Sequence, residues 1–344
     1  MARILVVGCG AIGGLVAARL TEHQGAEHAV EALTTNDAIA RAIQEDGLRI
    51  VGVEGESVAP VRCVRAASGT YDWVLLSTQP PQVEAAARDA LPFLAPDGAM
   101  VCFQNGLVEE RVAAIAGAGR VLGGVIAWGA SVKEPGVVER TSHGGFAVGR
   151  FDGRDDPRLR ELATMLEPIG PVDVEPDLAG ARWSKLAINC AISTLGTIGG
   201  DRLGALMKQR VVRRLALEIM TETVHVARAE GVELRKVSGT LDLNWLALRE
   251  NERRGGSASL VAKHSLLLAV GARYRKLRSS MLYAIERGRA PAVDFLNGEV
   301  VERGARHGIA TPVNAEAQRT VHAIAAGERP PSAQPLRDFA ARVL

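Results

Sequence analysis

Three glycines near the start of the chain, Gly8, Gly10 and Gly13, have the spacing Gly-x-Gly-x-x-Gly and lie between a predicted strand and a predicted helix. The strand is the apolar run 3–7, and an apolar, helix-compatible run, 15–20, follows the turn. In such a turn one glycine permits a tight bend, and the next lets the backbone approach a pyrophosphate. The third lets the helix pack on the strand, so that its N-terminal amides face the anion. The order predicts a dinucleotide site rather than a turn that needs glycine only for its shape, formed by Gly8, Cys9, Gly10, Ala11, Ile12 and Gly13.

Length and composition set outer limits. With 344 residues the chain exceeds what one hydrophobic core usually holds, so two domains are expected. Its 41 basic and 39 acidic residues are spread along the chain, which argues against nucleic-acid binding. No apolar run is long enough to cross a membrane, and no secretory signal is expected. The four cysteines lack the spacing of a metal site or a disulfide framework, which favours a cytoplasmic protein without a metal.

The first half of the chain alternates between strand-like and helix-like segments. Buried strands are predicted at 29–33, 73–76, 100–103 and 121–127, and helices at 38–45, 83–91 and 109–116. This alternation is typical of an α/β fold, a doubly wound parallel sheet of Rossmann type with helices on both faces. Two further segments, 137–140 and 146–149, are expected to add strands at an edge.

From about Asp177 the strand-like alternation ends, and helical patterns run to the C-terminus with glycine breaks between them. The sequence thus predicts a dinucleotide-binding Rossmann domain at 1–177 and an all-helical substrate or catalytic domain at 178–344, joined through 175–177. No internal repeat is visible.

One predicted helix carries a polar row on an otherwise apolar segment, 183–193. Lys185, Asn189 and Ser193 are spaced i, i+4 and i+8, so they share one face. Buried polar groups without partners are costly, so such a row meets water, a partner or a ligand. A desolvated lysine can give up a proton, whereas arginine cannot. From spacing alone, a solvent-seeking lysine with an asparagine cap fits equally well.

Six motifs in the chain resemble those of the ketopantoate reductases (2-dehydropantoate 2-reductases). They are VVGCGAIGG at 6–14, QNG at 104–106, WSKLAINC at 183–190, SSML at 279–282, DFLNG at 294–298 and HGIATP at 307–312. They occur in family order over nearly the whole chain, apart from a longer segment at 237–276.

The resemblance implies reduction of a 2-oxo acid to a 2-hydroxy acid by NADPH, with NAD also possible. Lys185 matches the catalytic lysine, which serves as general acid. Asn105 matches an asparagine at the nicotinamide and the substrate. The other implied substrate-binding residues are Asn189, Ser193 and Ser280, and the other cofactor contacts are Asn36, Thr78 and Gln79. The site is expected in a cleft between the domains.

Four departures from the family pattern bear on specificity. Ala292 stands where the family has a glutamate, Gln79 where a lysine commonly approaches the cofactor, and Ser193 where an asparagine binds substrate. No arginine follows the second strand, around 34–36, to hold a 2′-phosphate. We therefore expect a weaker preference for NADPH and an altered substrate. Asp37 fits a helix N-cap and a ribose ligand equally well.

Several alternatives stay open at this point. An opine, imine or 3-hydroxy-acid dehydrogenase has a similar cofactor domain, and a non-catalytic NADP-sensing protein would explain the missing glutamate. Segment 237–276 fits a roof over the site or a homodimer contact. His143 and His225 are expected to be structural or exposed, and His264 lies in the extra segment.

Overall fold

The computed structural model describes residues 2–24, 27–237 and 241–344, which form two compact units. The N-terminal unit comprises the chain up to Gln104 together with Val108–Ala179. The C-terminal unit comprises Asn105–Leu107 and Gly180–Leu344. The short segment Asn105–Leu107 thus belongs to the C-terminal unit, where Leu107 joins the hydrophobic core.

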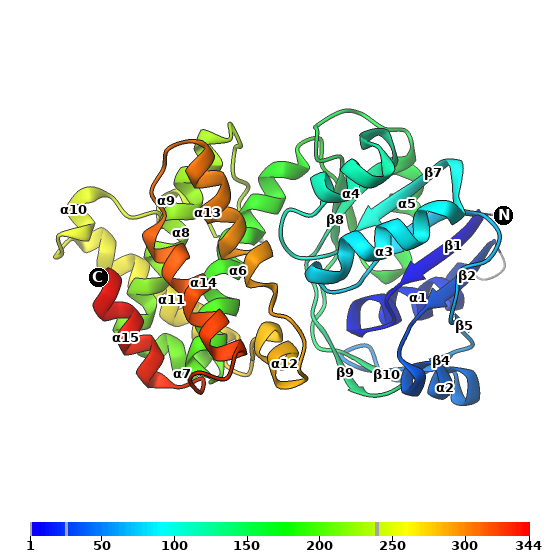
Figure 1. Ribbon diagram of the computed structural model, residues 1–344, viewed down its shortest axis with the longest axis horizontal. Helices are drawn as coiled ribbons and strands as arrows, with labels where there is room; N and C mark the ends of the chain where they lie inside the picture. The colour runs from blue at the N-terminus through cyan, green and yellow to red at the C-terminus, as the bar shows by residue number, and fades with distance from the viewer. Residues whose placement is uncertain (1, 25–26, 238–240) are drawn as a thin grey trace. The chain divides into compact units, whose positions relative to one another are not determined.

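The N-terminal unit is built on an eight-stranded sheet with the order β12-β11-β8-β7-β6-β1-β2-β5 (Figure 1). Six strands are parallel, and β11 and β12 run opposite to them. The strands are β1 (Ala2–Val7), β2 (His28–Leu33), β5 (Arg62–Val64), β6 (Tyr71–Leu76), β7 (Leu94–Cys102), β8 (Val121–Ile126), β11 (Phe146–Gly149) and β12 (Val172–Val174). The doubly wound, mostly parallel sheet predicted from the alternating segments is confirmed.

Helices cover both faces of this sheet. Ile4 and Val6 of β1 pack into one buried cluster with α1 and α5, and the intervening side chains point to the face of α3 and α4. The helices and 3₁₀ turns are α1 (Ala11–Gln24), α2 (Asp37–Asp46), η1 (Pro80–Gln82), α3 (Val83–Ala90), η2 (Leu91–Phe93), α4 (Glu109–Ala116), η3 (Ala118–Arg120), α5 (Arg158–Leu166) and η4 (Glu167–Ile169).

A second, four-stranded sheet in the same unit has the order β4-β3-β10-β9. Its strands are β3 (Leu48–Gly52), β4 (Ser57–Ala59), β9 (Ala130–Glu134) and β10 (Val137–Arg140). The expectation that 137–140 extends the main sheet is wrong, because these residues pair in parallel with β3 and antiparallel with β9. Residues 146–149 do join the main sheet, with β12 outside them.

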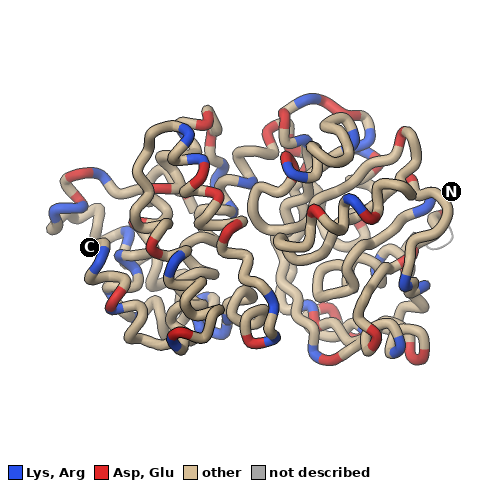
Figure 2. The backbone as a smooth tube through the Cα atoms, in the orientation of Figure 1, with Lys and Arg blue, Asp and Glu red and all other residues tan. Residues whose placement is uncertain are grey.

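The C-terminal unit is helical. Its elements are α6 (Leu178–Gly199), α7 (Leu203–Lys208), α8 (Arg210–Ala229), α9 (Leu243–Leu246), α10 (Glu250–Arg253), α11 (Ala258–Arg273), α12 (Ser280–Glu286), η5 (Ala292–Phe295), α13 (Asn297–Arg306), α14 (Pro312–Ala325) and α15 (Ala333–Val343). Helix α6 ends where Gly200 adopts a φ of 70°, a conformation that glycine reaches without steric cost. Within the described ranges, no helix is both long and apolar enough to span a bilayer. Basic and acidic positions are interspersed along both units (Figure 2).

A fully buried ion pair holds together the extra segment at 237–276. Lys263 Nζ of α11 lies 2.6 Å from Glu252 Oε2 of α10 and donates to the Ala247 carbonyl at 2.9 Å. Burial alone would raise the pKa of Glu252, but the Arg249 amide and Lys263 together lower that pKa to about 2. The Glu252 carboxylate is therefore charged at neutral pH, and its contact with Lys263 ties α11 to α10. Residues 238–240 of the segment lie outside the described residues, and its role as roof or dimer contact stays a prediction.

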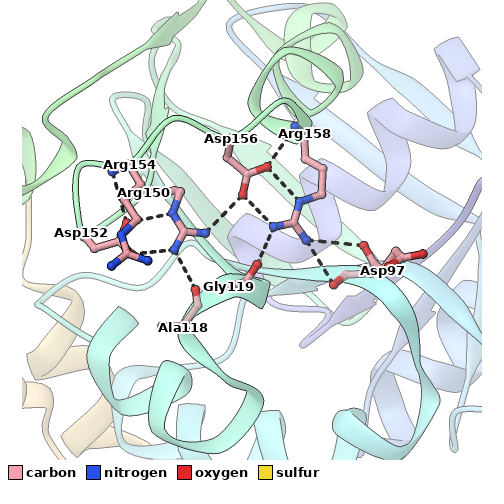
Figure 3. A network of polar contacts seen from close by, with 9 residues as sticks. Asp97, Ala118, Gly119, Arg150, Asp152, Arg154, Asp156 and Arg158 are labelled. Carbon is pink, nitrogen blue, oxygen red and sulfur yellow. Dashed lines mark hydrogen bonds and ion pairs between the residues drawn. The ribbon is translucent and has the colours of Figure 1, made fainter.

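An arginine–aspartate network lies at the end of the main sheet at which β7 and β8 begin (Figure 3). Arg158 donates from Nε to Asp156 Oδ1 at 2.9 Å and from Nη2 to Oδ2 at 2.7 Å, a bidentate pair. Its Nη2 also donates to the Gly119 carbonyl. Arg150, directly after β11, reaches Asp156 Oδ2 at 3.2 Å and the Ala118 carbonyl at 3.0 Å. The Asp156 carboxylate thus holds two arginines, from the ends of β11 and α5, and both arginines donate to carbonyls of η3.

Asp156→Asn is expected to destabilise the protein at pH 7 by about 1.5–3 kcal/mol, the range for hydrogen bonds to charged groups. The hydrogen bond from Arg158 lowers the pKa of Asp156 below its usual value, and burial only partly offsets this. A carboxylate with such a lowered pKa stabilises the folded state at pH values above its unfolded pKa of about 3.9. This stabilisation disappears as the pH falls through the pKa of the folded state. The difference between wild type and variant in urea unfolding should therefore shrink from about pH 5 downward.

The exposed neighbour Asp155 provides the control, because Asp155→Asn removes the same charge without this network. Equal pH dependence in both variants would show that the Asp156 contacts contribute nothing specific.

Candidate active site

The glycine turn at the end of β1 has the geometry that a pyrophosphate requires. Gly8 has a φ of 98°, and its amide donates to the Leu33 carbonyl of β2 at 2.9 Å. A Cβ on Gly13 would lie 1.9 Å from the Gly8 carbonyl oxygen, so only glycine lets α1 pack this closely. A Cβ on Gly10 would meet nothing within 4 Å. The backbone at Gly10 is therefore open beside the start of α1, where an anion is favoured.

The loop after β6 lies against this turn. A Cβ on Gly8 would be 3.0 Å from the Thr78 amide nitrogen, and one on Gly13 would be 2.8 Å from the Ser77 Cβ. The Ser77 hydroxyl is buried and has no hydrogen-bond partner among the described residues. Thr78 Oγ1 lies 3.4 Å from Gln104 Nε2, and Gln79 is exposed. The structure thus brings Thr78 to the glycine turn, as the sequence predicts for parallel strand ends.

Cys9, inside the turn, is a packing residue. Its thiol is buried, and burial raises its pKa to about 12, with a smaller effect from Cys63. The thiol stays neutral and is no nucleophile at neutral pH.

At the end of β2, Asn36 is the N-cap of α2: its Oδ1 accepts from the Ile39 amide at 3.0 Å. Asp37 is the first residue of the helix and is therefore not its N-cap, which leaves the role of ribose ligand as a prediction. Its carboxylate Oδ1 lies 2.7 Å from Arg65 Nη2 instead.

The segment that carries the polar row is helical throughout, as predicted. Lys185, Asn189 and Ser193 of α6 are half-buried, while Leu186 and Cys190 beside them are fully buried. The Asn189 Nδ2 atom is buried and has no hydrogen-bond partner within the described part of the chain. An amide donor of this kind is satisfied by an acceptor from outside the protein, a water or a ligand.

Two isoleucines accompany the polar row. Ile188 and Ile192 are also half-buried and lie one turn apart on the same side of α6. The partly exposed side of α6 thus carries a row of polar side chains and, next to it, a row of two isoleucines.

A buried amide fixes α6 in this orientation. Asn297 Nδ2 donates to the Cys190 carbonyl at 3.2 Å and to Asn314 Oδ1 at 2.9 Å, and its Oδ1 accepts from Thr194 Oγ1 at 2.6 Å. Glu222 in turn accepts from the Asn314 backbone amide at 2.8 Å. The asparagine of the DFLNG segment is therefore a structural residue.

The two serines of the SSML segment have different roles. Ser279 is buried and caps α12, and its hydroxyl donates to the Ser193 carbonyl at 2.8 Å. The Thr197 hydroxyl lies 2.8 Å from the Ser279 hydroxyl. Ser280 is exposed at the next position. The structure thus attaches the start of α12 to the Ser193 turn of α6, a contact that the sequence does not reveal because Ser279 lies 86 residues away.

Asn105 lies beside η5, the element that carries Ala292. Gly106 has a φ of 96°, and a Cβ on it would lie 2.5 Å from the Phe295 carbonyl oxygen. Asn105 and Ala292 are both half-buried. The nearby carboxylate of Asp294 does not replace the missing glutamate, because it pairs with His322 at 2.7 Å and is exposed.

Three histidines and two tryptophans of other segments have the following surroundings. His143 is exposed, and burial lowers the pKa of His225 on α8 and of His264 on α11. Trp128 packs edge-on against Phe146 in the core, and Trp245 lies over Lys263. Across the residues described, no group of three or more His, Cys, Asp or Glu side chains has the arrangement of a metal site.

Comparison with known proteins matches both halves of the chain. The model of the family "Ketopantoate reductase PanE/ApbA" matches residues 4–153, and that of its C-terminal domain matches residues 177–325. The chain is 32% identical over 321 residues to the 2-dehydropantoate 2-reductase of Halobacterium salinarum, covering 90% of this chain and 95% of that one.

Solved structures show the same fold. The 2-dehydropantoate 2-reductase of Geobacter metallireducens is 26% identical with a TM-score of 0.77, covering 93% of this chain and 99% of that one. A D-mandelate dehydrogenase in complex with NADH and anilino(oxo)acetate is 20% identical with a TM-score of 0.79, covering 94% and 99%. With both family models matched in order, the chain belongs to the ketopantoate reductase family, oxidoreductases that act on CH–OH groups.

Proposed function

We propose that this protein reduces a 2-oxo acid to a 2-hydroxy acid with NADPH and that Lys185 is the general acid. The observation that carries the proposal is on α6, where Lys185 lies one turn from Asn189, whose buried Nδ2 has no hydrogen-bond partner among the described residues. Family membership supports the 2-oxo acid, and the open glycine turn supports the dinucleotide.

The residues of the glycine turn fit a bound dinucleotide. Gly10 leaves its backbone uncovered, Gly13 lets α1 approach, and the first amides of α1 face the space beyond β1. The reduced nicotinamide would supply the hydride that adds to the substrate carbonyl carbon. Thr78 borders the turn from the loop after β6 and Gln79 follows it, and we assign both to the cofactor as well.

Lys185 would stabilise and protonate the oxygen that gains charge in this reaction. Its ammonium donates a hydrogen bond to the carbonyl oxygen and then delivers a proton to the alkoxide. The Asn189 amide has a donor ready for a hydroxyl or carboxylate oxygen of the same substrate. We assign Asn105, Ser193 and Ser280 to the remaining substrate oxygens.

Lys185→Ala is expected to lower kcat by about a hundredfold or more, the usual contribution of a general acid and oxyanion donor. Lys185→Arg should fail similarly, because arginine keeps the charge but does not release a proton. The dissociation constant of NADPH, from cofactor fluorescence, should stay within about twofold, since Lys185 is on α6 and not in the glycine turn. Lys208→Ala, at an exposed lysine of α7, is the control. An alanine variant of Lys185 with most of its kcat would contradict the assignment.

Gly10→Ala tests the cofactor site without disturbing the fold. The new methyl group meets no protein atom within 4 Å, so the melting temperature should not change. It would occupy the space where the pyrophosphate approaches the backbone, so affinity for NADPH should fall by about tenfold or more. Gly119→Ala, equally open, is the control and should bind normally. Unchanged affinity in Gly10→Ala would place the dinucleotide elsewhere.

Ala292 and Ser193 are smaller than the family's residues, and Ile188 and Ile192 border the polar row. A site without the groups that hydrogen-bond a substrate hydroxyl loses discrimination for that hydroxyl. We therefore expect poor kcat/KM for ketopantoate and a higher value for 2-oxo acids with bulkier or less polar tails. Ala292→Glu should raise kcat/KM for ketopantoate relative to kcat/KM for those acids. Efficient ketopantoate reduction by the unmodified protein, or no gain in the glutamate variant, would refute this specificity.

A further inference from the structure

A cation lies at the end of β2, although residues 34–36, which directly follow that strand, include none. Strand β5 pairs in parallel with β2, and the Thr34 amide continues the pairing by donating to the Val64 carbonyl at 3.2 Å. Arg65 therefore leaves β5 directly beside the segment 34–37. Its Nη2 donates to the Thr35 carbonyl at 3.1 Å and lies 2.7 Å from Asp37 Oδ1.

This place is the ribose end of the proposed cofactor site. Strands β1, β2 and β5 are adjacent, and the Gly8 amide is bonded to the last residue of β2. In a doubly wound sheet the pyrophosphate lies at the first glycine turn and the adenosine ribose lies beyond the end of the second strand. The guanidinium of Arg65 is held at that second position by the Thr35 carbonyl.

The other groups there are already engaged or neutral. Thr34 Oγ1 accepts from the Asn36 amide at 3.2 Å, and the Asn36 side chain caps α2. The contact between Arg65 and Asp37 is solvent-exposed, with 43% and 84% of the two side chains accessible. Exposed ion pairs of this kind contribute little, so a stronger anion displaces the carboxylate readily.

We infer that Arg65 binds the 2′-phosphate of NADPH and makes the protein selective for NADPH over NADH. The inference rests on the proposed function. Guanidinium and phosphate form a strong, charge-assisted contact, whereas a ribose hydroxyl offers only a neutral acceptor. Asp37 limits the selectivity, because it occupies the guanidinium in the absence of NADPH and carries a charge of the same sign as the phosphate.

A matched arginine on the same strand provides the control. Arg62, at the other end of β5, pairs through Nε with Glu31 Oε1 of β2 at 3.1 Å. It has the same charge, is more exposed at 72%, and lies at the opposite end of the strand from the glycine turn. Arg62→Gln therefore measures the effect of removing an arginine from β5 without touching the ribose position.

The experiment titrates wild type, Arg65→Gln, Asp37→Asn and Arg62→Gln with NADPH and NADH by cofactor fluorescence. Arg65→Gln should weaken the affinity for NADPH by about tenfold or more, the loss expected for a charged hydrogen bond, and the affinity for NADH by less than about twofold. Asp37→Asn should strengthen the binding of NADPH several-fold relative to the binding of NADH. Arg62→Gln should change neither cofactor.

Two further measurements keep the outcome decisive if Arg65→Gln folds poorly. Arg65→Lys retains the charge and should lie between wild type and Arg65→Gln. The fragment 2′,5′-ADP should protect wild type against thermal unfolding more than 5′-AMP, and this advantage should shrink in the Arg65 variants.

Equal loss of both cofactors, or no change in their ratio, in the Arg65 variants would overturn the inference while the proposed function stands. Wild type that binds neither cofactor would overturn both. If the Arg65 variants kept the strong preference for NADPH of the wild type, the 2′-phosphate would be bound by a different cation.

Discussion

The orientation of α6 depends on one buried amide. Asn297 has both of its donor hydrogens and its acceptor oxygen satisfied inside the C-terminal unit, by Cys190, Asn314 and Thr194. Leaving any of these buried groups unpaired would cost about 1–3 kcal/mol, so the helix has one favourable rotation. Because successive residues of a helix differ by about 100° in direction, a shift of one residue would bury Lys185 and expose Leu186. The chemistry proposed for this protein is thus set by a residue that does not take part in it.

The local parts of this arrangement are predictable from the sequence. The strand, glycine turn and helix at the N-terminus depend on neighbouring residues, and so does the polar row of α6, because helical spacing decides which side chains share a face. The role of Asn297 and the split between Ser279 and Ser280 are not predictable in this way. Each depends on contacts with residues more than eighty positions away, which no spacing rule reports.

The sheet shows the same limit. A short β-branched run such as 137–140 predicts a strand but not its partner, and here the partner is β3 rather than the main sheet. The missing cation at the end of β2 has the same origin. Residues 34–36, directly after β2, include no arginine, whereas the pairing of β5 with β2 brings Arg65 to the same place. Which strands are adjacent therefore decides both the shape of the N-terminal unit and the charge at one of its proposed binding positions.

The four-stranded sheet also constrains the order in which the N-terminal unit can form. Its strands come from two parts of the chain, 48–59 and 130–140, and β3 pairs with β10 across the interval between them. During synthesis β3 and β4 are made early, but β3 acquires its second neighbour only after β10 has emerged. Until then one edge of β3 exposes unpaired backbone groups, the kind of edge that promotes association between chains. A ribosome-bound chain whose β10 is still inside the exit tunnel should therefore need protection from a chaperone more than one long enough for β10 to have emerged.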